Sequence, residues 1–394
     1  MILLQTAALF RDAYRELNAR KLFWLSMILS GVVVLSFSLV GFEDGFLKIF
    51  IWKTPFALEA MGMERGTFYK FVFLNFGVTF WLAWATTIIA IVTTASIIPD
   101  FISGGAIDLA LSKPIGRVRL FLTKYAAAMI FVALQVTVFA VLSFFVLGLR
   151  GQTWEPVVFL TIPMMIVYVS YIYCISALVG LLTKSTLAAL IVSLLFWFGI
   201  FLVNQADVTL IQFKAFNQER LDTAEYRLHI LEEKQLQQSG DGANGILDTV
   251  KQMVTSGFDE AAIERATEHR NAEQKSFDSL SRWHNRLIAL KSVIPKTTET
   301  KQILERQLIS MNEVENIIGA RSTHAEDRFS VDDEGELVVD EFDWKFDPEA
   351  DNIAKSAVKS EIRGRTILWV VGTSLGFEAF ILAICCWVFS RRDY

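Results

Sequence analysis

Six long apolar segments separate the polar parts of this chain. They comprise residues 22–41, 71–98, 125–149, 157–182, 186–203 and 366–389. A helix of about 20 apolar residues crosses the ~30 Å hydrocarbon core of a bilayer, and no segment carries enough charge to forbid insertion. The pattern predicts six transmembrane helices, and we expect the second to end at Pro99.

Two polar regions complete the pattern. Residues 2–20 place apolar side chains at helical spacing opposite charged ones, which predicts a helix that lies in the membrane interface or packs on the bundle. Residues 204–365 are polar and predict mainly helices, over 213–231 (continuing the fifth span), 260–290 and 300–318, then a β-hairpin over 328–340 and a third strand over 342–346.

We therefore expect an all-α polytopic membrane protein. It has six transmembrane helices, an N-terminal interfacial helix, and a large, mostly helical extracytoplasmic insertion with a small β-hairpin between spans five and six. The predicted parts are residues 1–203, 204–365 and 366–394.

Composition and charge support this division. The chain is 53% apolar, with a mean hydropathy of +0.42. Residues 204–365 carry 21 bases and 31 acids, which gives 21 − 31 = −10, while the rest carries 16 − 11 = +5. An oily, mildly basic part and an acidic, water-soluble part exclude a single soluble globule and a fully disordered chain, and argue against a basic nucleic-acid binder.

The short loops predict the orientation. With a cytoplasmic N-terminus, cytoplasmic loops and tails collect eleven Lys and Arg residues and the opposite short loops five. This bias predicts a multi-pass protein of the plasma (inner) membrane with both termini in the cytoplasm. Arg363 and Arg365 conflict with it, but a long loop translocates largely regardless of charge.

Few residues indicate catalysis or metal binding. Cys174, Cys385 and Cys386 lie in apolar segments and indicate packing rather than disulfides or zinc. The chain has no P-loop and no hydrolase or metalloprotease motif. We expect no catalytic residue, no metal site, and histidines that serve packing or the surface. The acidic run over 332–351 suits a solvated face better than a calcium site, because it lacks the EF-hand register.

The segment between the second and third spans is too polar to insert and too apolar for a free loop. Asp100 suits a helix start, Gly104 and Gly105 permit close backbone approach, and a helix would end before Pro114. The segment predicts a short cytoplasmic helix on the membrane surface, which either meets a partner or contacts nothing.

This segment resembles the cytoplasmic loop of ABC exporter permeases of the type-two superfamily. The matching residues are Asp100, Gly105-Ala106, Leu109-Ala110-Leu111-Ser112, Pro114, Arg117 and Lys124, with a similar aromatic-Arg-Arg-Asp-aromatic tail at Phe389 to Tyr394. The family pattern more often has Glu at the acidic position and Gly-Thr at the pair. The resemblance covers residues 1–203 and 366–394.

The resemblance implies a permease subunit of an ATP-driven exporter and not an enzyme. It would pair with a second permease subunit, as a homodimer or heterodimer in membrane lipid, and with cytoplasmic ABC ATPase subunits that hold the ATP and Mg; no cofactor is expected on this chain. The residues implied to couple to the ATPase are Asp100, Gly104, Gly105, Asp108, Ser112, Pro114 and Arg117. The alternative is a non-transporting scaffold or sensor whose extracytoplasmic part binds a protein partner.

One carboxyl group lies within a span. Glu378 is near the middle of the sixth segment, where a charge costs about 2.5 kcal/mol or more. It either lines a cargo path or a proton-sensitive contact, or is a neutral acid hydrogen-bonded to another helix, for example at Gln135 or Asn75.

Overall fold

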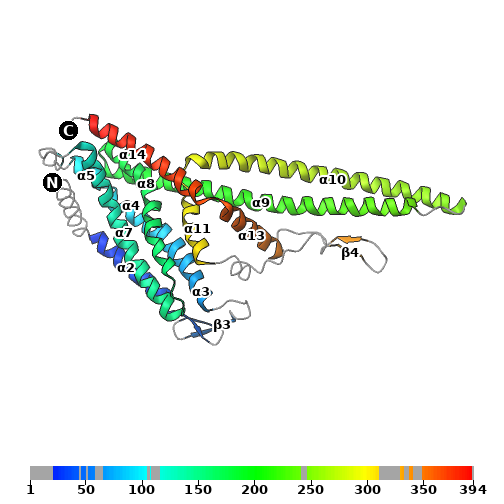
Figure 1. Cartoon of the computed structure of the whole chain (residues 1–394), viewed down its shortest axis with the longest axis horizontal. Helices are drawn as coiled ribbons and strands as arrows, with labels where there is room; N and C mark the ends of the chain where they lie inside the picture. Colours follow the sequence, from blue (N-terminus) through cyan, green and yellow to red (C-terminus); the bar gives the residue numbers. More distant parts are fainter. Residues whose placement is uncertain are drawn as a thin grey trace. The chain divides into compact units, whose positions relative to one another are not determined.

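The computed structural model is mostly helical (Figure 1). It describes residues 21–43, 46–49, 52–57, 65–103, 107, 116–240, 246–309, 329–331, 337–339 and 348–392. The predicted interfacial helix over 2–20, the helical residues predicted over 310–318 and the strand predicted over 342–346 lie outside this part of the chain. The predicted all-α membrane class is confirmed in its main feature, which is a set of long apolar helices.

The chain divides into two compact units. Unit 1 comprises residues 1–204, 291–317 and 363–394, and unit 2 comprises 205–290 and 318–362. These units differ from the predicted parts, because residues 291–317 group with the membrane helices and not with the polar insertion. The chain passes between the units four times.

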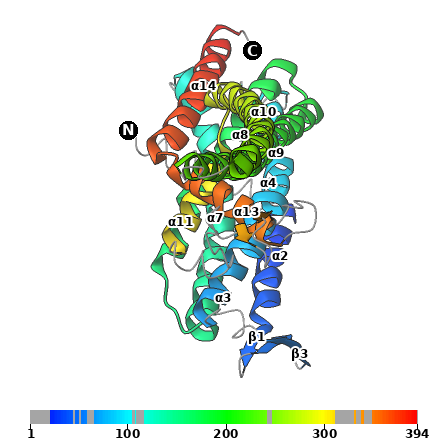
Figure 2. The same ribbon diagram turned by 90° about the vertical axis from the view of Figure 1, so that its right-hand side faces the viewer.

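Unit 1 holds the apolar helices. Its elements are α2 (Lys21–Ser38), α3 (Arg65–Val72), η2 (Phe73–Thr86), α4 (Thr87–Thr94), α5 (Ile97–Ser103), α7 (Arg117–Arg150), η3 (Pro156–Leu160), α8 (Thr161–Thr183), the first part of α9 (Thr186–Gly240), α11 (Thr297–Leu308), η5 (Leu368–Gly372) and α14 (Thr373–Arg391). α7 is central and packs against α2, α8 and α14. Figure 2 shows these helices from a second direction.

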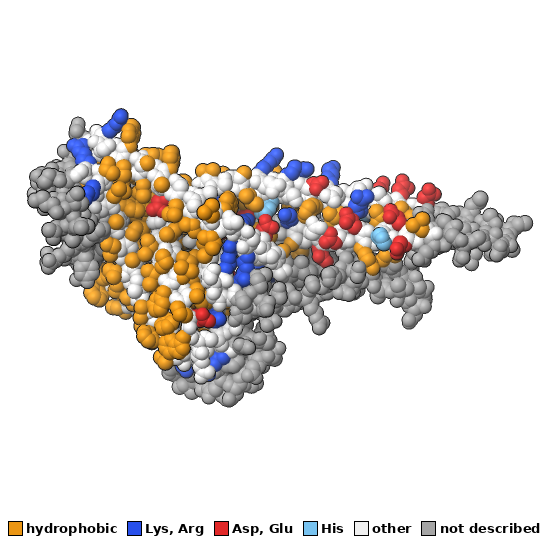
Figure 3. Space-filling model, viewed as in Figure 1, with side chains coloured by type: hydrophobic (Ala, Val, Ile, Leu, Met, Phe, Trp, Pro, Cys, Tyr) orange, Lys and Arg blue, Asp and Glu red, His pale blue; other side chains and the backbone are white. Residues whose placement is uncertain are grey.

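Among the described residues, five helical segments are long and apolar enough to cross a membrane. They are Arg65–Ser103, Arg117–Arg150, Pro156–Thr183, Thr186–Glu233 and Leu368–Arg391. The first predicted span is shorter than expected, since its apolar helix covers only Phe23–Ser38 and β1 (Val40–Glu43) follows it. Orange apolar side chains cover much of the visible face of unit 1 in Figure 3, as a lipid-facing surface requires.

The last span shows how one helix divides core from lipid. In α14 and η5 the successive buried residues lie three or four apart, as one helical stripe: Val370, Ser374, Glu378, Ile381, Cys385 and Phe389. On its other faces, Leu368 is 86% exposed and Phe380 64%. Cys174 and Cys385 are buried and Cys386 is partly exposed.

Pro99 does not end the second span. The helix breaks instead at residues 95–96, and α5 begins at Ile97. Pro99 therefore lies in the first turn of α5, where a missing N–H costs nothing. The candidate membrane span, which includes α5, therefore extends to Ser103.

Unit 2 consists mainly of the polar parts of two long helices. They are the later part of α9, which ends at Gly240, and most of α10 (Ile246–Val293). The strands β4 (Phe329–Val331) and β5 (Leu337–Val339) pair antiparallel where the sequence predicts a hairpin, and most of α13 (Pro348–Gly364) follows. A second small sheet, in unit 1, joins β1, β2 (Phe46–Ile49) and β3 (Trp52–Ala57).

Candidate functional site

α11 carries charged and hydroxyl side chains into the packed interior of unit 1. Its buried residues are Thr297, Glu299, Thr300, Ile303, Leu304 and Leu308, which lie on one helical face. That face packs against α8, η2, η3 and η5. The sequence folds this way because Ile303, Leu304 and Leu308 require burial, and Glu299 is on the same face as Ile303, one turn away.

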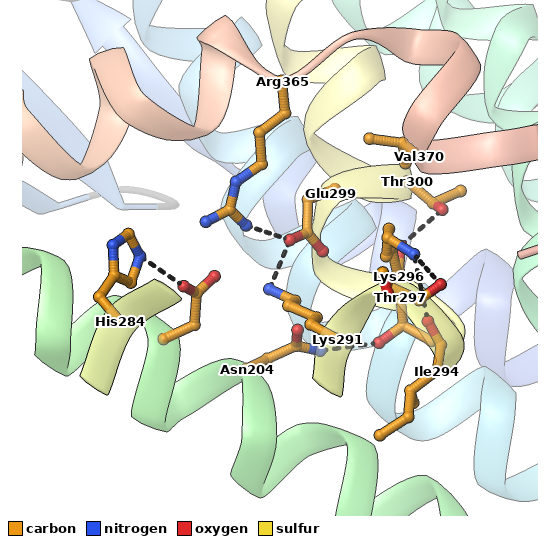
Figure 4. A network of polar contacts seen from close by, with 12 residues as sticks. Asn204, His284, Lys291, Ile294, Lys296, Thr297, Glu299, Thr300, Arg365 and Val370 are labelled. Atoms are coloured by element: carbon orange, nitrogen blue, oxygen red, sulfur yellow. Dashed lines mark hydrogen bonds and ion pairs between the residues drawn. The ribbon is translucent and has the colours of Figure 1, made fainter. Parts of the chain in front are cut away.

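Glu299 forms the centre of a buried charge cluster. Its Oε1 atom binds both Lys291 Nζ and Arg365 Nη1 (Figure 4). The three side chains are 0%, 3% and 9% exposed, respectively. We call Lys291, Glu299 and Arg365 the Glu299 clamp. Two cations on one carboxylate leave an excess positive charge inside the protein, which is costly unless the geometry is fixed.

Lys296 lies beside the clamp. Its Nζ donates to the carbonyl oxygens of Ser292 (3.3 Å) and Ile294 (3.4 Å) and to Thr373 Oγ1, and it lies 4.4 Å from the ring centroid of Trp369. Burial lowers the pKa of Lys296 to about 8, although the nearby Glu299 carboxylate opposes this.

Two arginines hold the other end of α11. Arg306 on α11 donates to the carbonyl oxygen of Arg365 (2.8 Å), and Arg363 donates to the carbonyl oxygen of Ile309 (3.0 Å), directly after α11. A cation there also complements the helix dipole. Burial lowers the pKa of Arg306. The backbone N–H of Lys296, directly before α11, donates to Ser374 Oγ in the last span (3.0 Å). The start of α11 is therefore bound to the last span, and its end is bound to the residues that precede that span.

Three of the four passages between the units are fastened to α11 or to the residue after it. Asn204, the last residue before the first passage, donates from Nδ2 to Thr297 Oγ1 (3.1 Å). Lys291, the first residue after the second passage, binds Glu299. Arg363, the first residue after the fourth passage, binds Ile309. α11 is thus a fixed point for the segments that enter and leave unit 1.

The ends of the membrane helices agree with alternating spans. At one end, Arg117 donates to the carbonyl oxygens of Ser390 (3.1 Å) and Arg392 (2.9 Å), and Arg392 donates to those of Leu181 and Leu182. The start of α7 and the ends of α8 and α14 therefore lie together.

At the opposite end of unit 1, the starts of the spans Arg65–Ser103 and Pro156–Thr183 meet. Tyr69 donates to the carbonyl oxygen of Val40 (2.8 Å), which follows α2, and Lys70 pairs with Glu155 (2.9 Å), which precedes η3. Both contacts join segments that alternating spans place on the same side of the membrane.

The three predicted intramembrane polar residues have separate environments. Glu378 is bound by Tyr125 and Ser170, and not by either predicted partner. Asn75 is exposed and donates to the carbonyl oxygen of Phe71 (2.9 Å), within its own helix. Gln135 is fully buried, and within the described residues both polar atoms of its side chain lack a partner.

The predicted ATPase-contacting residues are only partly described. Asp100 is exposed in the first turn of α5, and Arg117 starts α7 with the contacts given above. The other five (Gly104, Gly105, Asp108, Ser112 and Pro114) lie outside the described residues.

Unit 2 has its own buried polar pair and a surface groove. Asp207 and His284 are almost fully buried, and His284 Nε2 lies 3.1 Å from Asp207 Oδ1. A groove of about 380 Å³ is lined by α9 and α10 with small or aliphatic side chains and three basic ones: Ala224, Arg227, Ile230, Leu231, Ala262, Arg265, Ala266 and His269. In the described part of the chain, no group of three or more His, Cys, Asp or Glu residues could hold a metal ion.

Residues 24–216 match a family described as "Protein of unknown function (DUF2705)". No curated protein and no solved structure matches the chain. The assignment to the ABC exporter permeases is wrong, because the match is to this family and no ABC transporter family is found. The error has a physical source. A helix that stops before a proline and basic residues at cytoplasmic helix ends occur in many membrane proteins for reasons of backbone geometry and charge.

The Glu299 clamp was missed in the sequence. Its signal is present, because Glu299 occupies a position on the apolar stripe of its helix. The acidic composition of residues 204–365 obscured it, since one further acid in that region appeared solvated.

Proposed function

We propose that the chain is a membrane-anchored sensor or scaffold. Unit 2 binds a protein partner, and unit 1 anchors it and receives the resulting conformational change. The observation that carries this proposal is the fastening of three inter-unit passages to α11. A buried ion cluster is a poor source of stability but a good means of fixing one geometry, as a relay requires.

The last span is the element that would respond. Arg365, Trp369, Thr373 and Ser374 all contact α11 residues or Lys296. A displacement of α10 or α13 would therefore act on η5 and α14 through the clamp. Bistable packed elements of this kind convert small shifts into discrete changes.

The groove of unit 2 is the proposed docking place. Arg227 and Arg265 border it, while Ala262, Ala266 and Leu231 supply apolar contact. Within an acidic region, this basic and apolar groove suits an acidic amphipathic helix of the partner. We place unit 2 outside the cytoplasm, as the Lys and Arg distribution favours.

Cysteine labelling tests the orientation. Leu236 is 74% exposed on α9, and Lys184 is exposed next to the Arg117 end of unit 1. In intact cells, a membrane-impermeant maleimide should modify Leu236→Cys and not Lys184→Cys. The opposite result refutes the orientation.

Photo-crosslinking tests the function. A photoreactive amino acid at Ala266, in the full-length protein in cells, should give a discrete adduct with one extracytoplasmic protein that contains an acidic helix. Arg227→Glu with Arg265→Glu should abolish the adduct. The matched control Arg282→Glu, an exposed α10 position outside the groove, should retain it. An adduct that survives the double reversal, or none at all, refutes the docking place.

A second measurement tests the relay. Cys386 in the last span is partly exposed, whereas Cys174 and Cys385 are buried. When Glu299 is present, partner binding or charge reversal in the groove should change the labelling rate of Cys386. In the Glu299→Gln background, neither perturbation should change that rate. Equal changes in both proteins would refute the relay.

A further inference from the structure

The carboxyl group of Glu378 is held inside the last span by two hydroxyl groups from other helices. Tyr125 Oη on α7 lies 2.8 Å from Oε1, and Ser170 Oγ on α8 lies 2.8 Å from Oε2. Glu378 is 8% exposed. Within the described chain, no lysine, arginine or histidine bonds to this carboxyl group.

Both hydroxyl groups also contact backbone carbonyl oxygens. Tyr125 Oη lies 3.0 Å from the oxygen of Ser170, and Ser170 Oγ lies 2.8 Å from the oxygen of Val167. Each hydroxyl has one proton to donate. When Glu378 is ionised, the two hydroxyl protons are the only ones that can form hydrogen bonds in these four oxygen–oxygen contacts. A protonated Glu378 supplies a third.

Among the residues that the structure describes, no charged group lies against Glu378. α14 packs against α8, α7 and η5, and its Phe377 stacks on Phe196 of α9. The titratable groups that face Glu378 are Tyr125 on α7 and Tyr171 and Cys174 on α8, and η5 contributes none. All three are neutral at neutral pH. An ionised carboxylate here would be a buried charge with only two neutral donors, which is unfavourable in an apolar interior.

We propose that Glu378 is a proton-binding site that holds its proton at neutral pH and joins α7, α8 and α14 through it. The carboxyl O–H donates to Tyr125 Oη, the Tyr125 hydroxyl donates to the Ser170 carbonyl oxygen, and the Ser170 hydroxyl donates to Glu378 Oε2. The Val167 oxygen keeps its helical N–H partner. Removing the proton takes away the donor to Tyr125 Oη and leaves a buried charge, so it loosens α14 from α7. This inference does not depend on unit 2 or its partner.

Infrared spectroscopy of the full-length protein in lipid vesicles at neutral pH tests the site. The carbonyl stretch of a protonated carboxylic acid should be present in the native protein and in Glu155→Gln, which changes an acid outside the spans. It should be lost in Glu378→Gln. Absence of the band from the native protein, or its survival in Glu378→Gln, overturns the proposal.

A second variant covers the case in which Glu378→Gln fails to fold. Tyr125→Phe keeps the carboxyl group and removes the proposed acceptor, so the band should remain and shift in frequency. An unshifted band overturns the proposed proton path. Ser143→Ala, a buried α7 hydroxyl away from this contact, serves as the control and should leave the band unshifted.

Discussion

Replacing Glu299 with Gln should be the most damaging conservative change in unit 1. The substitution keeps the shape of the side chain but removes the charge that both Lys291 and Arg365 face. The cluster changes from a net charge of +1 to +2, in a place where the exposed fractions of the three side chains are 9% or less. Removing one partner of a buried ion pair typically costs about 3–5 kcal/mol, and we expect the free energy of unfolding to fall by an amount in this range.

Two other variants make the argument quantitative. Lys291→Met leaves a balanced ion pair between Glu299 and Arg365. This variant should therefore lose clearly less unfolding free energy than Glu299→Gln. Glu155→Gln breaks the Lys70 ion pair, whose side chains are 13% and 27% exposed. Such a partly solvated pair contributes about 1 kcal/mol or less. The expected order of destabilisation is Glu299→Gln, then Lys291→Met, then Glu155→Gln.

Denaturant unfolding of the purified protein in detergent micelles, followed by tryptophan fluorescence, measures this order. Near-equal midpoints for the Glu299 and Glu155 variants would refute the argument, because they would mean that the clamp is hydrated. A Lys291→Met variant less stable than Glu299→Gln would refute the assignment of Glu299 as the centre.

Three further outcomes are expected. Asp207→Asn should cost about 1–3 kcal/mol by weakening the buried contact to His284, whereas Asp222→Asn at an exposed i,i+4 contact should cost less than about 1 kcal/mol; urea unfolding compares them. The unfolded chain binds more protons than the folded one between the lowered pKa of Lys296, about 8, and its ordinary 10.5. Stability should therefore rise with pH across that window, by at most about 3 kcal/mol, and Lys296→Met should flatten the rise in the melting temperature. Gly148→Ala should lower the melting temperature because its Cβ would lie 2.4 Å from an indole carbon, whereas Gly199→Ala meets nothing within 4 Å and should be neutral or stabilising by up to about 1 kcal/mol.

Hydrophobic periodicity predicted most of the membrane helices, because burial in lipid imposes the same requirement on each span. It predicted the helix boundaries less well where local backbone geometry determines them. The first helix stops at Ser38 and a strand follows, and Pro99 fits the first turn of a new helix after a break. Neither outcome is visible in a count of apolar residues.

The polar sites were harder to predict, because their partners are distant in sequence. Glu378 was identified from its cost in lipid, but its contacts to Tyr125 and Ser170 span 253 and 208 residues. Glu299 and Arg365 are separated by 66 residues and meet only because α11 packs among the membrane helices. Tertiary packing therefore brings together the residues of both sites.

The last span joins these two sites along one face. Ser374 and Glu378 are one turn apart on its buried stripe. Lys296, directly before α11, contacts the stripe at Ser374, and α7 and α8 contact it one turn further on at Glu378. Both contacts use polar groups, in a helix whose other faces are apolar and exposed. Apolar contacts between helices are weakly directional in lipid, whereas polar contacts fix rotation about the helix axis. A change at the clamp would therefore turn the last span against the Glu378 contact. Glu299→Gln should shift the infrared band of Glu378, and an unchanged band would show that the two sites act separately.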